Sequence, residues 1–195
     1  MRRLVLLFDG TWNDERHPDA ATNIVRLWEL IAHGSREAKD RNESVDQRIF
    51  YDEGVGTGYL DRLTGGFFGS GLSEKVCHGY RFLSQFYEAG DEIYIFGFSR
   101  GAFTARSLAG FVAASVLLRE EECNRDNLAF AWKYYRTPPK ERFPADRATL
   151  QNNLGNRFHD TKLGSAIDFA FHAQSPLRHL TSQARCLFFC SNSGT

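Results

Sequence analysis

The sequence has no excess charge of either sign, no long hydrophobic run and few cysteines. Its 195 residues include 24 basic and 24 acidic side chains, so no net charge draws the chain toward nucleic acid or anionic lipid. No stretch reaches the roughly 20 apolar residues that a membrane-spanning helix needs. The apolar run at residues 4–8 is too short for a secretory signal, because Asp9 interrupts it. We therefore expect a protein that is cytoplasmic in the producing cell, with no signal peptide, no transmembrane segment and no nucleic-acid partner.

The cysteines and glycines give no sign of a disulfide scaffold or a cofactor. No two cysteines have the CxxC spacing, and disulfide scaffolds are normally shorter and richer in cysteine. The thiols that we predict to be reduced are Cys77, Cys123, Cys186 and Cys190. No HExxH motif, EF-hand spacing or histidine and cysteine cluster indicates a metal, and the glycine-rich loop at residues 54–58 lacks the lysine of a P-loop. We expect no cofactor and no metal.

What the sequence does contain is enough apolar side chain for one compact core. Hydrophobic residues make up 42% of the chain and aromatic residues 14%. Apolar runs typical of buried strands occupy residues 3–8, 48–51 and 92–96. Apolar residues at helical spacing mark helices near residues 24–31, 76–87, 102–116 and 128–135. Strands and helices alternate, which predicts an α/β fold with a mostly parallel sheet flanked by helices.

Capping residues predict where the first two helices begin and end. Thr22 or Asn23 is suited to cap the first helix at its N-terminus, and Gly34 to stop it. Gly90 is expected to end the second helix, just before the third strand. Residues 40–47 are polar, and we interpret them as a connector that leads into the second strand.

The motif with the clearest chemistry is Gly-Phe-Ser-Arg-Gly at residues 97–101. A Gly-x-Ser-x-Gly set between a buried strand and a helix of small residues is typical of a nucleophile elbow, which lifts the serine hydroxyl above the sheet. Gly97 and Gly101 suit it because strand and helix approach too closely there for a Cβ atom. Ser99 is the candidate nucleophile, and the Arg100 N–H at the positive helix end is a candidate oxyanion donor. The alternative is that Ser99 merely caps the helix.

A second part of the candidate site follows the first strand. In an α/β-hydrolase the other oxyanion donor comes from a loop after an earlier strand, and this chain has Gly10 and Thr11 there. Their N–H groups are candidate donors, although a simple Asp-Gly turn is the alternative. Asp-Gly-Thr is also similar to the motif of haloacid-dehalogenase-type phosphatases. Leu7 stands where their nucleophilic aspartate would be, and a leucine cannot attack phosphorus.

Four blocks of the sequence, taken together, resemble a known family. They read LVLLFDGTWN at the start, IFYDEGVGTG in the middle, GFSRGAFTAR at the elbow and FHDTKL at residues 158–163. In order and spacing they are similar to the catalytic domain of type VI secretion phospholipase effectors. The resemblance implies an α/β-hydrolase fold and a serine esterase acting on lipid or other esters. It implies Ser99 as the nucleophile, peripheral membrane contact, secretion by a type VI system and its components as partners.

The resemblance leaves the partners of the nucleophile open. A serine nucleophile needs a histidine base and a carboxylate, which follow it in the order serine, acid, histidine in this fold. The family's Trp-Asp-Thr-Val-Gly and Gly-x-His-x-Asp-Val-Gly-Gly blocks are absent. His159 and His172 are weak base candidates, and the acid is not identified. We predict a hydrolase-like catalytic domain over residues 1–172 that is incomplete at its C-terminal end, followed by an atypical tail at residues 173–195.

Two functions therefore stay open. The first is a serine hydrolase of the esterase or phospholipase type that uses Ser99 on carboxylic esters, those of lipids above all. The second is a catalytically inactive or fragmentary α/β-hydrolase-fold protein that retains the elbow and lacks the triad acid and base. Both predict the same fold, and they differ in whether Ser99 reacts.

Overall fold

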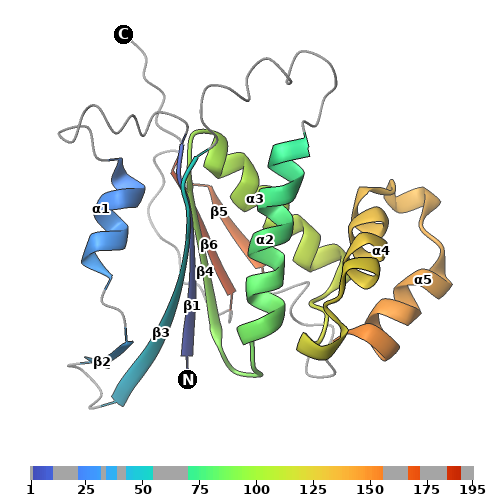
Figure 1. Ribbon diagram of the computed structural model, residues 1–195, viewed down its shortest axis with the longest axis horizontal. Coiled ribbons are helices and arrows are strands. Elements are labelled where there is room, and N and C mark those ends of the chain that lie inside the picture. The colour runs from blue at the N-terminus through green and yellow to red at the C-terminus, as the bar shows by residue number, and fades with distance from the viewer. Residues whose placement is uncertain are drawn as a thin grey trace, which may run out of the picture.

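The structure is a computed structural model that describes residues 2–10, 22–31, 34–38, 43–54, 70–155, 167–171 and 184–189. Within these ranges a six-stranded sheet is flanked by helices on both faces (Figure 1). The strands are β1 (Arg2–Phe8), β2 (Gly34–Ala38), β3 (Glu43–Asp52), β4 (Glu92–Phe98), β5 (Ile167–Phe171) and β6 (Ala184–Phe189). The helices are α1 (Asn23–Leu30), α2 (Ser70–Phe86), α3 (Arg100–Ser115), α4 (Arg125–Arg136) and α5 (Pro144–Ala148). The α/β fold predicted from the sequence is confirmed.

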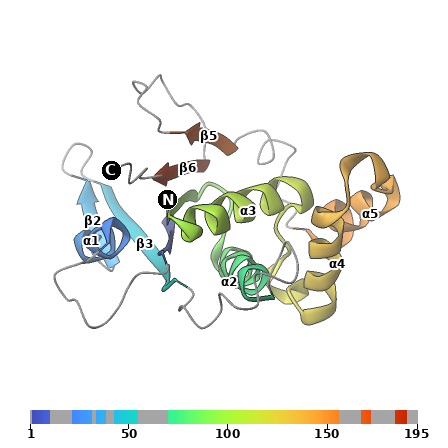
Figure 2. The same cartoon turned by 90° about the horizontal axis from the view of Figure 1, so that it is seen from above.

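The sheet has the order β2-β3-β1-β4-β6-β5, and only β2 runs antiparallel to its neighbour. The central strand β1 lies between β3 and β4, and its last five residues are buried. A central parallel strand is covered on both faces, so it needs the continuous apolar run that predicted it. Seen from above, α1 lies on one side of the sheet and α2, α3 and α4 on the other (Figure 2).

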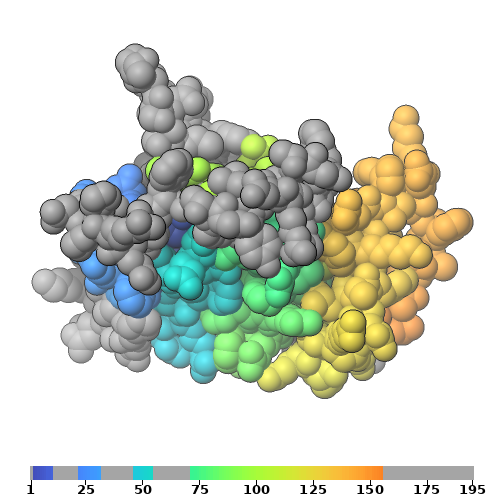
Figure 3. Space-filling model, turned by 45° about the horizontal axis from the view of Figure 1, so that its top comes forward, coloured from blue at the N-terminus to red at the C-terminus, as the bar shows by residue number. Residues whose placement is uncertain are grey.

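The two faces of β1 enter two separate cores. Leu4, Leu6 and Phe8 pack against α2 and α3, whereas Val5 and Leu7 pack against α1. The larger core continues into α4, where stacked and edge-on aromatic rings join the helices. In the space-filling view, α4 and the residues after it form one flank of the molecule beside α2 (Figure 3).

The edge of the sheet differs from the prediction. Thr22 caps α1 as expected and accepts a hydrogen bond from the Val25 N–H, but the helix ends before Gly34, which instead begins β2. Residues 43–47, predicted as part of a connector, form the first half of β3 and pair with β2. An edge hairpin needs no buried apolar run, so its polar sequence gave no strand signal.

Strands β5 and β6 were not predicted from the sequence. Strand β6 belongs to the segment 173–195 that we predicted as a tail, yet it pairs in parallel with β4, with Leu187 beside Phe96. The domain boundary at residue 172 stays a prediction, and part of the following segment lies in the sheet. Among the described residues, no helix has the length and apolar character that crossing a bilayer requires.

Candidate active site

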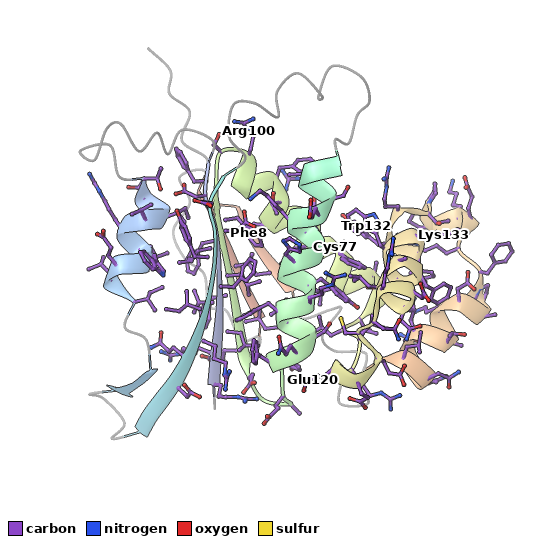
Figure 4. All side chains as sticks on the ribbon, in the orientation of Figure 1. Phe8, Cys77, Arg100, Glu120, Trp132 and Lys133 are labelled. Carbon is purple, nitrogen blue, oxygen red and sulfur yellow. The ribbon has the colours of Figure 1, made fainter. Side chains whose placement is uncertain are left out.

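Three strands end together at one edge of the sheet. In the register of the parallel strands, Phe8 at the end of β1 lies beside Gly97 of β4 and beside Asp52 of β3. Open α/β sheets bind their ligands outside the carboxyl ends of the strands. Figure 4 shows Arg100 at this edge, where β4 turns into α3. The motif at residues 97–101 therefore lies where the fold places its ligand sites.

Ser99 occupies this turn in a strained backbone conformation. Its φ is 55° and its ψ is −122°, and in the described residues Val116 alone shares a positive φ among non-glycine residues. Such a conformation costs about 1–3 kcal/mol and persists only where the surroundings impose it. Ser99 is exposed, and although it precedes α3 its side chain makes no capping hydrogen bond. Thr22, by contrast, has the extended backbone and the hydrogen bond of an ordinary cap.

The two glycines of the motif permit the turn by removing side chains. A Cβ atom on Gly97 would lie 2.4 Å from the carbonyl oxygen of Gly101. A Cβ atom on Gly101 would lie 2.2 Å from the carbonyl oxygen of Phe8. Both distances are far below van der Waals contact with immobile backbone, so the predicted close approach of strand and helix is confirmed. The turn is fixed by β1 on one side and by α3 on the other.

Asp9 is a buried carboxylate at the same edge, with 2% of its surface exposed. Its Oδ1 accepts a hydrogen bond of 2.7 Å from the Gly10 N–H. Its Oδ2 accepts hydrogen bonds from the hydroxyls of Thr22, at 2.8 Å, and Tyr51, at 3.0 Å. The Asp9 N–H donates to the carbonyl of Asp52 at 2.9 Å. One carboxylate thus joins the end of β1 to the cap of α1 and to β3.

Gly10 brings this loop against the elbow. A Cβ atom on Gly10 would lie 3.2 Å from the Cβ of Ser99, so the backbone of the loop is a direct neighbour of the candidate nucleophile. The Gly10 N–H, one of the predicted oxyanion donors, donates to Asp9 in this structure. Thr11, His159 and His172, the remaining predicted site residues, lie outside the described residues. Ser99, Arg100 and Gly10 are therefore the predicted residues that the structure brings together.

Arg100 places a cation next to Ser99. The side chain is partly buried, and its Nη1 is enclosed with no hydrogen-bond partner among the described residues. Burial lowers the pKa of the guanidinium, which nevertheless remains charged in proteins. A desolvated nitrogen donor without a partner is rare in folded proteins, and it suits an anionic ligand.

A second cation lies near the end of β3. Lys75, on the first turns of α2, forms an ion pair with Asp52 and donates a hydrogen bond of 2.6 Å to the carbonyl of Glu53. This pairing neutralises Asp52 and fixes α2 against the edge of the sheet. In the part of the chain that the structure describes, no group of three or more histidine, cysteine, aspartate or glutamate residues is placed to hold a metal ion.

Sequence reasoning missed Asp9 as a residue of the site. Its hydroxyl partners lie 13 and 42 positions along the chain, so no local pattern links them. The available signal was a single acidic residue directly after a fully apolar strand, at the edge where ligands bind.

Comparisons with known proteins give one family and one curated relative. The family model described as "T6SS, Phospholipase effector Tle1-like, catalytic domain" matches residues 2–172. Uncharacterized protein YEL023C of Saccharomyces cerevisiae is 32% identical over 149 residues, which cover 69% of this chain and 20% of that protein. The chain therefore spans about a fifth of the length of this relative. No solved structure matches significantly.

Proposed function

Because this chain belongs to the Tle1-like phospholipase effector catalytic-domain family of type VI secretion systems, we propose that it is a serine hydrolase of lipid carboxylic esters. The family's description supports a lipase or phospholipase function. The observation that supports the serine mechanism best is the conformation of Ser99. Its hydroxyl is exposed at the carboxyl edge of the sheet, on a strained turn, without the hydrogen bond that a capping serine makes.

In the proposed reaction the Ser99 Oγ attacks the ester carbonyl carbon. A histidine base takes the hydroxyl proton, and the carbonyl π electrons move to the oxygen to form an oxyanion. When the intermediate collapses, the C–O bond to the alcohol breaks and the base returns the proton to the leaving oxygen. Water then releases the acid from the acyl-enzyme by the same steps in the same order. His159 and His172 follow Ser99 in the chain, as this fold requires, and remain the base candidates.

Backbone amides next to Ser99 are the proposed oxyanion donors. The Arg100 N–H begins α3, where the helix dipole and the unpaired amides favour negative charge. The loop after β1 is the second source. The Gly10 N–H would first have to leave Asp9, so within the Gly10 and Thr11 pair the Thr11 N–H is the stronger candidate. Removing one such donor from an acyl-transfer enzyme costs about 10²–10³ in kcat.

The Arg100 guanidinium supports an anionic lipid as the substrate. A phosphodiester lies a few bonds from the acyl esters of a phospholipid, and a guanidinium binds it through paired N–H donors. The enclosed Nη1 of Arg100 has a donor to offer such a group. Delivery by a type VI system belongs to the same proposal, and the family match supports it. Peripheral contact with a membrane is proposed only as a consequence of a lipid substrate.

A fluorophosphonate probe, which reacts with activated serines, tests the proposal. We expect the probe to label Ser99, and Ser99→Ala to abolish both labelling and hydrolysis of phospholipid vesicles. Ser115→Ala is the matched control, because this serine lies at the far end of the same helix and its hydroxyl donates to the Phe111 carbonyl. Labelling should survive in the control. A folded protein that is not labelled would overturn the hydrolase and favour a non-catalytic member of the fold.

A further inference from the structure

A groove of about 310 Å³ lies between α2, α3 and α4, on the side of the sheet that faces away from α1. Its size is at the lower end of the roughly 300–1,000 Å³ range of small-molecule sites. The side chains that form most of its wall are Leu72, Val76, Phe103, Ser107, Trp132 and Tyr135. Each helix supplies two of these six, four of which are fully apolar or nearly so, and Ser73 and Arg136 complete the wall.

The groove begins one helical turn from Ser99. Arg100, Phe103 and Ser107 are spaced by three and four residues, so they form one stripe along α3. At 1.5 Å per residue, Phe103 lies about 6 Å along the helix axis from the elbow. Phe103 is 45% exposed, which is unusual for so large an apolar side chain on a helix that is otherwise mostly buried. The stripe leads from the candidate nucleophile into the groove.

The polar residues in the wall are two serines, Tyr135 and Arg136. Burial raises the pKa of Tyr135, so its hydroxyl stays neutral. Leu72, Val76 and the Trp132 ring complete a surface that offers no carboxylate to a ligand. A long apolar chain gains free energy by leaving water for such a surface, at about 25 cal/mol per Å² buried. Over this apolar part of the wall a polar or charged ligand would lose its hydration without replacement, and among the described residues Arg136 is the one charged side chain that lines the groove.

We propose that this groove binds the acyl chain of the ester whose carbonyl reaches Ser99, an inference that rests on the function proposed above. The carbonyl lies at the elbow, the hydrocarbon chain extends along α3 past Phe103 toward Trp132, and the head group lies on the Arg100 side. This arrangement makes the α2, α3 and α4 groove the part of the protein that selects chain length. Binding of a hydrocarbon chain in the groove can be measured in a protein that does not catalyse the reaction, whereas the role of the nucleophile cannot.

The first experiment measures binding without turnover. A bromine-labelled long-chain fatty acid quenches tryptophan emission on contact, and Trp132 lines the groove. The chain has a third tryptophan, Trp12, so the experiment uses a protein that carries both Ser99→Ala and Trp12→Phe. In it we expect saturable quenching below the micelle concentration of the fatty acid, and loss of most of the quenching when Trp132→Phe is added. Trp28 belongs to α1, which lies on the opposite face of the sheet, so it should report little quenching. Quenching that is absent, or that is unchanged by Trp132→Phe, would overturn the groove as the acyl site.

The second experiment measures chain-length selectivity. Ser73→Trp places a large side chain in the wall of the groove, and Gln85→Trp places the same side chain on exposed α2 surface three turns away. We expect Ser73→Trp to lower kcat/KM for a long-chain ester about tenfold and for an acetate ester less than twofold. Gln85→Trp should change neither value. An equal effect of Ser73→Trp on both esters would contradict the proposal.

The two experiments separate the groove from the nucleophile. If Trp132 is quenched but the fluorophosphonate does not label the protein, the result supports the acyl-binding groove and contradicts the proposed catalysis. If Ser99 is labelled but there is neither quenching nor a change in chain-length selectivity, the result supports the catalysis and contradicts the acyl-binding groove.

Discussion

Two buried aspartates lie at opposite edges of the same sheet and are held in different ways. Asp91, directly before β4, is 5% exposed and pairs with the Arg2 guanidinium at 3.0 Å. It also accepts backbone hydrogen bonds from Arg2 and Glu88. Asp9, directly after β1, is 2% exposed, and its described partners are neutral: one amide and two hydroxyls.

The difference separates an aspartate that links strand ends through an ion pair from one that fixes a loop beside the candidate nucleophile. Burial alone would lower the pKa of Arg2, but hydrogen bonding and charge pairing with Asp91, and then with Glu88, raise it. Asp9 is held instead by the N–H and O–H dipoles of neutral groups, and no cationic side chain among the described residues pairs with it. Its geometry determines the backbone at Gly10, which lies against Ser99. At the amino edge the aspartate pairs with a cation, whereas at the carboxyl edge it fixes the backbone beside the candidate nucleophile.

Removing the Asp9 carboxylate should have the largest effect. Asp9→Ala leaves the hydroxyls of Thr22 and Tyr51 and the Gly10 N–H without their acceptor, so we expect the free energy of unfolding to fall by about 3 kcal/mol. Asp9→Asn retains one acceptor oxygen and should cost about half as much. Both variants should lower kcat/KM of the folded protein by at least about tenfold, since the loop beside Ser99 shifts. Urea unfolding and ester hydrolysis measure the two effects.

The corresponding change at the amino edge should affect stability alone. Asp91→Ala breaks the pair with Arg2 and removes the acceptor of the Glu88 N–H. Arg2 is partly exposed, so solvent screens the pair, and we expect a loss of about 2 kcal/mol in the free energy of unfolding. The kcat/KM value, measured where the variant is fully folded, should equal that of the parent protein. A tenfold fall in kcat/KM would remove the distinction between the two edges.

The parts of the site that could be predicted from the sequence are those encoded locally. The run before Asp9 predicts a strand buried on both faces because every side chain in it is apolar. The spacing of Gly97, Ser99 and Gly101 predicts a close approach of β4 and α3 because glycine is the residue that permits it. In both cases the physical cause lies within a few residues of the signal.

The remainder depends on contacts between distant residues. The sequence predicted Thr22 or Asn23 as the helix cap, and Thr22 is the one that caps α1. Its second role as a donor to Asp9 arises from the packing of α1 against the end of β1. Strand β6 was not predicted, because a short apolar run forms a strand only when a neighbour such as β4 offers a free edge. Polar residues 43–47 became strand for the same reason.

Replacing Ser99 by glycine and by alanine should separate backbone strain from chemistry. Glycine adopts a positive φ without strain, whereas alanine keeps the Cβ atom that makes φ of 55° costly. We expect Ser99→Gly to be more stable than Ser99→Ala by about 1.5 kcal/mol in urea unfolding, and both variants to lack fluorophosphonate labelling. Equal stabilities would mean that the carboxyl edge stores no strain at this turn.

Two tyrosines provide the smallest and most specific test of the difference between the edges. The Tyr51 hydroxyl donates to Asp9 at 3.0 Å, and the Tyr94 hydroxyl donates to Glu92 at the amino edge, also at 3.0 Å. Tyr51→Phe keeps the ring contact with Trp28 and loses only the hydroxyl. We therefore expect the free energy of unfolding to fall by about 1 kcal/mol and kcat/KM to fall a few-fold. Tyr94→Phe should cost about 0.5 kcal/mol or less and leave kcat/KM unchanged, because the Glu92 carboxylate is more exposed to water. If the Tyr51 hydroxyl acts through Asp9, Tyr51→Phe will have little further effect on kcat/KM in an Asp9→Asn background, whereas additive losses would assign it a separate role.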